Sequence, residues 1–124
     1  MSNPIVKELL EDIKESVELV LSRTESVITT EDFLKDDIAL EKLDAVSMRL
    51  QVIGKTLKKM NSIDAEILSK HPEIEWGKII RLRDFISHHY FDLDAEIIFD
   101  VVKNHLPQLR KSINKIILDL NKEK

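Results

Sequence analysis

The stretch from Asp37 to Met60 carries the strongest structural signal in the chain. Its apolar side chains recur at alternating spacings of three and four residues, which is the period of one face of an α-helix. These side chains are Leu43, Val46, Leu50, Ile53, Leu57 and Met60. An apolar face of this length must be covered by neighbouring helices, so it predicts one seam of a helical bundle, and it also suits a seam between two copies of the chain.

Glycine and proline are too scarce for a fold built on tight turns. The 124 residues include 2 Gly and 3 Pro, which leaves little material for β-hairpins, Gly-rich phosphate loops or a nucleotide-binding βαβ unit. Dinucleotide and P-loop chemistry are therefore excluded. A chain of this length is expected to form one domain. We predict a single all-α domain over residues 1–124, an antiparallel, up-and-down bundle of four to six helices.

The composition also limits the setting in which the protein works. Cysteine is absent, which excludes a disulfide framework, a thiolate nucleophile, a Cys-type zinc site and an iron–sulfur cluster. No apolar run approaches the roughly 20 residues that a bilayer-spanning helix needs, and the N-terminal stretch is acidic and amphipathic. We therefore expect a cytoplasmic protein that is neither secreted nor embedded in a membrane.

Caps and prolines indicate where the helices begin. Asn3 can cap a helix that starts at Pro4, and its expected apolar stripe is Ile5, Leu9, Ile13, Val17, Val20 and Leu21. The expected helices are 4–22, 37–60, 62–70, 75–87, 95–104 and 106–121, with Pro107 near the start of the last one. Gly54 falls inside the second, where it indicates either a close approach of a neighbouring backbone or a tolerated imperfection.

Charge is unevenly distributed along the chain. Residues 1–50 carry 6 basic and 12 acidic side chains, a balance of −6, whereas residues 51–124 carry 13 and 11, a balance of +2. A polyanion is therefore expected to meet the second half, although solvated helix faces give the same pattern. Most of the local positive charge comes from Lys55, Lys58, Lys59, Lys78, Arg81 and Arg83.

The segment from Arg81 to Tyr90 concentrates the side chains that can carry chemistry. It holds two arginines, the adjacent histidines His88 and His89, and the tyrosine. Histidine can move a proton near neutral pH, arginine can stabilise charge on a phosphate, and tyrosine offers a modifiable hydroxyl. This combination suits cleavage of a phosphate ester without a metal.

A structural role fits the same residues. The histidines can stand at the C-terminal end of a helix, where the dipole favours a cation, Tyr90 can pack, and Arg83 can pair with Asp84 or Asp92. At about 100° per residue, Arg83 and His88 lie about 140° apart around a straight helix. They can share a site only if the helix ends near residue 87, or if they come from the two chains of a symmetric dimer.

Other catalytic arrangements lack support. No two histidines have the spacing of a metal site on a helix, and no serine stands in a nucleophile elbow. The acidic pairs Asp36-Asp37 and Asp92-x-Asp94 are read as helix-capping or solvated residues rather than as an acid/base dyad. We therefore expect no metal ion and no cofactor.

The same segment resembles a known family. Arg83-Asp84-x-x-x-His88-x-Tyr90 matches the R-polar-x-x-x-H motif of HEPN domains and the longer R-x-x-x-x-H-x-Y form of HepT-like proteins. Trp76, the acidic Asp92-x-Asp94 and the pair Leu106-Pro107 are also similar to that family. The resemblance is best over residues 72–120, while the first half matches mainly in its helical pattern.

The resemblance implies a HEPN-like helical homodimer that acts as a metal-independent endoribonuclease, the toxin of a type VII-like toxin–antitoxin pair. His88 would be the acid/base group at the 2′-hydroxyl or the leaving oxygen, and Arg83 would orient and stabilise the scissile phosphate. Asp84 takes the polar motif position, where it either orders Arg83 or weakens RNA binding. His89 falls at a variable position and is left out of the site.

The resemblance also implies a partner. Tyr90 would accept AMP from a minimal nucleotidyltransferase antitoxin, and the added charge and bulk would block a site that must accept RNA phosphate. The two proteins could assemble into a higher hetero-oligomer. The RNA chemistry needs only a base, an acid and a positive clamp, because the 2′-hydroxyl is an internal nucleophile. The expected product is a 2′,3′-cyclic phosphate or its hydrolysis product.

Two other readings stay open. The chain could be a non-catalytic helical dimer that binds and regulates a nucleotidyltransferase, as an antitoxin or regulatory subunit; the net charge of −4 and Asp84 favour this reading. It could also be a plain scaffold bundle, in which Arg83 and His88 affect stability alone.

Overall fold

The described part of the chain, residues 3–86 and 91–122 of a computed structural model, consists of helices joined by short loops. No strand occurs among these residues, which confirms the predicted all-α class. In chain order the elements are α1 (Pro4–Arg23), the 3₁₀ turn η1 (Thr30–Phe33), α2 (Asp37–Ile63), α3 (Ala65–Ser69), α4 (Trp76–Ile80), α5 (Leu82–Phe85), α6 (Phe91–Asp100), the π-helical turn η2 (Val101–His105) and α7 (Leu106–Asn121).

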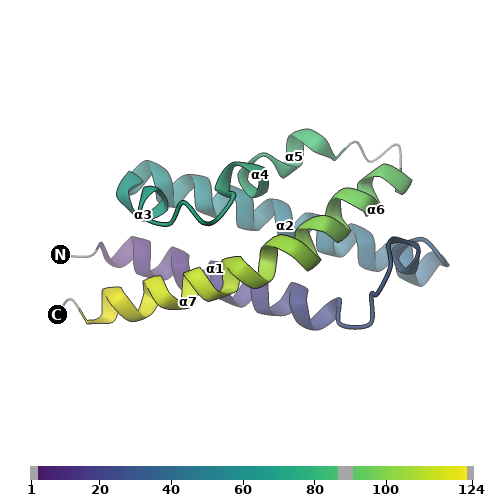
Figure 1. The fold of residues 1–124 in the computed structure, drawn as a ribbon, viewed down its shortest axis with the longest axis horizontal. Helices are drawn as coiled ribbons and strands as arrows, with labels where there is room; N and C mark the ends of the chain where they lie inside the picture. The colour runs from purple at the N-terminus through teal and green to yellow at the C-terminus, as the bar shows by residue number, and fades with distance from the viewer. Residues whose placement is uncertain (1–2, 87–90, 123–124) are drawn as a thin grey trace.

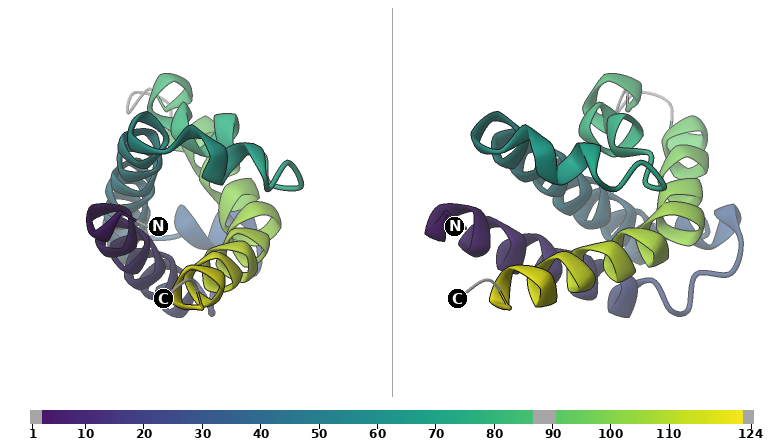
Figure 2. Two further views of the ribbon diagram at one scale, coloured as in Figure 1. Left: turned by 90° about the vertical axis from the view of Figure 1, so that its left-hand side faces the viewer. Right: turned by 60° about the vertical axis from the view of Figure 1, so that its left-hand side comes forward.

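The elements run alternately in opposite directions, as an up-and-down bundle requires. Figure 1 shows α1 running one way, α2 returning, α4 and α5 running forward again, and α6 and α7 returning as one bent rod. α1 packs against both α2 and α7, and α4 packs against α2. The end-on view in Figure 2 shows these elements surrounding a common centre. Among the described helices, none combines the length and the apolar character needed to cross a membrane.

The first helix begins where the sequence predicts, but its buried stripe is shifted by one residue at the start. The Asn3 side chain accepts a hydrogen bond from the Ile5 backbone N–H at 2.8 Å, and Pro4 takes the first turn. Ile5 is 53% exposed, so its predicted place in the core is wrong, and Val6 and Leu10 are buried instead. Leu9 and Leu21 are only partly buried. The sequence offers two adjacent stripes here, and packing against α2 and α7 selects between them.

The second helix confirms its predicted core face. All six apolar residues of its stripe are buried. The Asp36 side chain caps the helix by accepting from the Ala39 backbone N–H at 2.7 Å, and the helix continues to Ile63, slightly beyond the predicted end. Asp64 then caps α3 by accepting from the Glu66 backbone N–H at 3.1 Å.

Gly54 marks a close contact between two backbones. A Cβ atom built at this position would lie 2.6 Å from the backbone oxygen of Ile79 in α4, which is closer than real Cβ atoms approach such an atom. This confirms the first of the two readings of Gly54. The missing side chain lets α4 lie directly against α2, and α4 leads into α5.

The predicted helix 62–70 begins later, at Ala65, and two further predicted helices are divided or joined differently in the structure, each for a packing reason. The predicted helix 75–87 is split at Arg81 into α4 and α5, and Ile86 is already extended; the split lets both Leu82 and Ile86 reach the core. The predicted helix 95–104 begins at Phe91 and is not separated from the last helix. Pro107 cannot donate a helical hydrogen bond, and the π-helical turn just before it keeps the rod continuous.

Candidate active site

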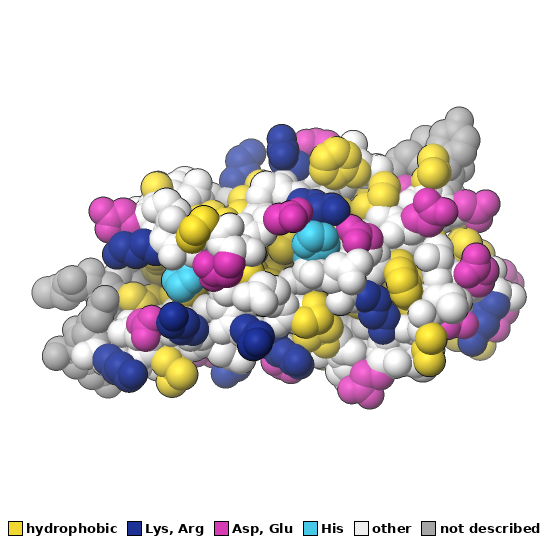
Figure 3. Space-filling model, in the orientation of Figure 1, with side chains coloured by type: hydrophobic (Ala, Val, Ile, Leu, Met, Phe, Trp, Pro, Cys, Tyr) yellow, Lys and Arg dark blue, Asp and Glu magenta, His cyan; other side chains and the backbone are white. Residues whose placement is uncertain are grey.

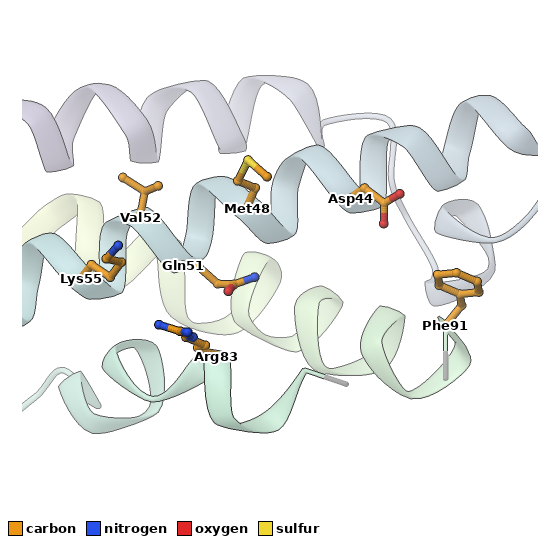
Figure 4. Close-up of a pocket in the computed structure, with 7 residues that line it drawn as sticks. All are labelled: Asp44, Met48, Gln51, Val52, Lys55, Arg83 and Phe91. Carbon is orange, nitrogen blue, oxygen red and sulfur yellow. The ribbon is translucent and has the colours of Figure 1, made fainter. Parts of the chain in front are cut away.

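A groove of about 730 Å³ lies between α2, α5 and the start of α6. We call it the Arg83 groove. Figure 4 shows the seven side chains that line it. Five come from α2, one from α5 and one from α6: Asp44, Met48, Gln51, Val52, Lys55, Arg83 and Phe91.

Arg83 extends into this groove from the short helix α5. Its guanidinium is directed across the groove toward Gln51 and Lys55 (Figure 4). The pairing with Asp84 or Asp92 that a structural role predicts is not formed, because within residues 3–86 and 91–122 no carboxylate makes an ion pair with Arg83. Arg83 and Asp84 are both exposed. The guanidinium is therefore available to a ligand.

His88 and Tyr90, the other two predicted motif residues, lie outside the described residues, as does His89. The described residues that precede them still show where the helix that carries Arg83 ends. α5 ends at Phe85 and Ile86 has extended backbone angles, φ −89° and ψ 124°. The helix that carries Arg83 therefore ends before residue 87, which is one of the two conditions under which Arg83 and His88 could share a site. The segment 87–90 joins Ile86 to Phe91, and Phe91 itself lines the groove.

The six cations that supply most of the local positive charge in the second half of the sequence lie on different surfaces. Lys55 and Arg83 line the Arg83 groove. Lys78 and Arg81 line a separate hollow of about 530 Å³ against α6, together with Phe85. Lys58 and Lys59 are exposed on α2. A polyanion that enters the groove therefore meets two of these six charges.

The charge of Lys78 is compensated by a polar cluster on α6 and η2. Its Nζ donates to Asp100 Oδ2 at 2.7 Å, Asn104 Nδ2 donates to Asp100 Oδ1 at 2.8 Å, and His105 Nε2 lies 3.3 Å from the same carboxylate. Figure 3 shows a histidine side chain bordered by acidic and basic side chains near the middle of the face that is turned toward the viewer. The hydrogen bond from Lys78, and then the one from Asn104, lower the pKa of Asp100 below its ordinary value.

This shift predicts a loss of stability in acid. The folded state binds the Asp100 proton more weakly than the unfolded state does. The stability that ionised Asp100 contributes to the fold is therefore present above the unfolded pKa and is lost as the pH falls below about 4. The pair is more than one-third exposed, so we expect less than about 1 kcal/mol. Chemical denaturation at pH 6 and pH 3 should show a larger fall in the free energy of unfolding for wild type than for Asp100→Asn. Equal falls would contradict this assignment.

The acidic pairs behave differently from each other. Asp36 caps α2, as predicted. Asp94 lies in the first turn of α6 and is 4% exposed, so its reading as a solvated residue is wrong. Within the residues that the structure describes, no group of three or more His, Cys, Asp or Glu side chains is arranged to hold a metal ion.

Two polar features of the structure are not predicted from the sequence. Gln51 stands one helical turn before Lys55 on the groove side of α2, a spacing of four that could have indicated it. Glu73 Oε2 accepts from Ser112 Oγ at 3.0 Å and lies 3.2 Å from His71 Nδ1. This second cluster ties the loop before α4 to α7, and no local pattern in the sequence points to it.

Comparisons with known proteins give one consistent family. A family model described as "Ribonuclease HepT-like" matches residues 6–116. "Putative RNase MJ0127" of Methanocaldococcus jannaschii is 36% identical over 118 residues, covering 95% of this chain and 92% of the relative. "Probable ribonuclease HepT" of Thermococcus cleftensis is 36% identical over 110 residues, covering 89% and 94%. "Putative RNase TTE0752" of Caldanaerobacter subterraneus subsp. tengcongensis is 31% identical over 115 residues, covering 93% and 94%. No solved structure gives a match.

Proposed function

This chain belongs to the HepT-like ribonuclease family, and from that premise we propose that it is a metal-independent endoribonuclease whose active site is built on the Arg83 groove. Ribonuclease activity follows from the family. The roles of particular residues and the biological role are part of this proposal. The observation that carries them is Arg83, an exposed guanidinium without an ion pair among the described residues, directed into a groove that Phe91 also lines.

The proposed reaction divides two roles between two side chains. Arg83 holds the scissile phosphate and stabilises the negative charge that grows on it as the 2′-oxygen attacks phosphorus. His88 moves a proton, taking it from the 2′-hydroxyl or giving it to the departing 5′-oxygen. One P–O bond forms at the 2′-oxygen, one breaks at the 5′-oxygen, and the products are a 2′,3′-cyclic phosphate and a free 5′-hydroxyl. No metal is needed, because the nucleophile belongs to the substrate.

Exposed apolar side chains beside Arg83 support a homodimer. Met48 is 70% exposed, and Phe91 is 47% exposed at the other side of the same groove. Side chains of this kind next to a polar site are typical of an interface. A two-fold dimer through them would bring two Arg83 segments into one cleft and concentrate positive charge on an acidic molecule. Sedimentation equilibrium should give a dimer, and Met48→Glu should shift it toward monomer; a wild-type monomer would contradict this arrangement.

The same apolar side chains also favour the second candidate function. A non-catalytic dimer that binds and regulates a nucleotidyltransferase would use them as a protein interface, with Arg83 contributing to binding rather than to cleavage. The two candidates differ in one observable property, which is whether the purified protein cleaves RNA.

We place the protein as the toxin of a toxin–antitoxin pair and Tyr90 as its control point. Incubation with ATP and its cognate minimal nucleotidyltransferase should add one AMP to the chain, abolish RNA cleavage and relieve the growth arrest that solo expression causes. An AMP phosphodiester brings a negative charge and a nucleoside next to a site for RNA phosphate.

The matched control is Tyr90→Phe, which lacks only the hydroxyl. It should remain unmodified in intact-mass spectra and should keep cleaving RNA in the presence of the partner. Addition of AMP to Tyr90→Phe, or full cleavage by the modified wild type, would contradict the assignment of Tyr90.

A further inference from the structure

The Arg83 groove is unevenly charged along its length. Figure 4 shows Asp44 and Phe91 toward one end, and Lys55 with Gln51 and Arg83 toward the other. Asp44 is the acidic member of the lining set, and it is separated from Lys55 by about three turns of α2. An anion in the groove is therefore attracted to one end and repelled from the other.

Lys55 and Arg83 are two cations, both unpaired among the described residues, that line one groove. Within the described ranges 3–86 and 91–122, neither makes an ion pair. Lys78 pairs with Asp100 at 2.7 Å, Lys70 with Glu66 at 3.6 Å, and Arg110 with Glu18 at 3.8 Å. Two like charges that line one hollow repel each other unless an anion lies between or beside them.

The wall between the two cations carries a polar side chain that is fixed in place. Gln51 Nε2 donates to the Oγ of the buried Ser47 at 3.2 Å, which holds the Gln51 side chain along the groove side of α2. Lys55 follows one turn further along α2, and the apolar Val52 also lines the groove between them. This arrangement leads from Arg83 to Lys55 without an intervening acid among the groove-lining residues.

We infer that Lys55 is an RNA-binding residue of this site, and that it holds a phosphate neighbouring the one held by Arg83. This inference rests on the proposed ribonuclease function and adds a direction to it. The RNA strand leaves Arg83 toward Lys55 and away from Asp44. Lys55 touches the backbone rather than the reacting atoms, so it contributes to binding in the same way for every sequence.

The test is the salt dependence of RNA binding. The probe is a fluorescein-labelled, fully 2′-O-methylated single-stranded RNA of mixed sequence, which lacks the attacking hydroxyl and stays intact. For wild-type protein, Lys55→Ala and Lys115→Ala, the Kd is measured by fluorescence anisotropy between about 0.05 and 0.5 M KCl. Over this range the Debye length shortens and the screening of phosphate contacts increases. Lys115 is an exposed lysine on α7 and serves as the charge-matched control.

Loss of one phosphate contact has a defined signature. We expect Lys55→Ala to raise the Kd about fivefold near 0.1 M salt and to reduce the slope of log K against log salt by about 0.7. Lys115→Ala should match wild type, and Asp44→Asn should bind more tightly because it removes a repelling charge. Unchanged thermal unfolding of Lys55→Ala will show that the fold is intact; on cleavable RNA, KM should rise while kcat changes little.

The outcomes separate this inference from the function on which it rests. Binding by wild type with equal Kd and slope for Lys55→Ala would overturn the role of Lys55 alone. Equal losses in Lys55→Ala and Lys115→Ala would also overturn it, because the effect would then be one of net charge. Absence of RNA binding by wild type would overturn the ribonuclease proposal together with the inference.

Discussion

Arg83→Ala and His88→Ala are each expected to reduce RNA cleavage by about 10²–10⁴-fold, the range typical of removing a positioned acid/base group or a preorganised charge from a transition state. The fold should survive both changes. Arg83 is exposed and makes no ion pair among the described residues. The free energy of unfolding of the Arg83→Ala protein should therefore differ from that of wild type by less than about 0.5 kcal/mol. Initial rates on single-stranded RNA, with denaturation curves for each variant, measure both quantities.

The structure offers a close control for Arg83. Arg81 is also an exposed arginine, two residues earlier, but its Nε donates to the Gly77 carbonyl oxygen at 3.2 Å and it lines the separate hollow against α6. Arg81→Ala should therefore cleave RNA at nearly the wild-type rate. A loss of equal size in both arginine variants would show that general positive charge, rather than the position of Arg83, supports cleavage.

Gly54→Ala is expected to destabilise the fold by about 2 kcal/mol, although alanine ordinarily stabilises a helix by about 1 kcal/mol over glycine. The reason is the 2.6 Å approach of the new Cβ to the backbone oxygen of Ile79. A backbone atom in a packed helix cannot rotate away as a side chain can, so α4 must shift from α2. Because α4 leads into α5, the same shift should displace Arg83 and lower the cleavage rate.

Gly77→Ala is the matched control, because it makes the same chemical change in a different environment. The atoms nearest to its Cβ would belong to the side chain of Arg81, with Nη2 at 3.3 Å, and that flexible end can move. We expect Gly77→Ala to be neutral or to stabilise the fold by less than about 1 kcal/mol. Thermal denaturation of the two variants gives the comparison, and equal effects would show that the contact between α2 and α4 does not depend on Gly54.

The long helices could be predicted from the sequence because their signals are local and agree with each other. The stripe from Leu43 to Met60 has one helical phase, and Asn3 and Asp36 are strong caps directly before the helices they begin. The first helix shows the limit of this reasoning. Ile5 and Val6 fit helical stripes equally well, and only the positions of α2 and α7 decide which of them is buried.

The candidate site was harder to predict because it is assembled from distant parts of the chain. The motif identifies Arg83 from its spacing to His88, but the groove opposite Arg83 is formed by residues of α2 that lie 28 to 39 positions earlier in the chain. The split at Arg81 and the early start of α6 depend on tertiary packing, which local periodicity does not contain. The roles of His88 and Tyr90 stay predictions, since those residues lie outside the described part of the chain.

The most direct test of the central proposal is RNA cleavage by purified wild-type protein in excess EDTA. Intact-mass measurement should first establish that the chain carries no AMP. We predict cleavage of single-stranded RNA to fragments with 2′,3′-cyclic phosphate ends, at a rate that EDTA does not change and that Arg83→Ala lowers by about 10²–10⁴-fold. Intact RNA after incubation with folded, dimeric, unmodified wild-type protein would contradict the proposal and favour the regulatory binding module.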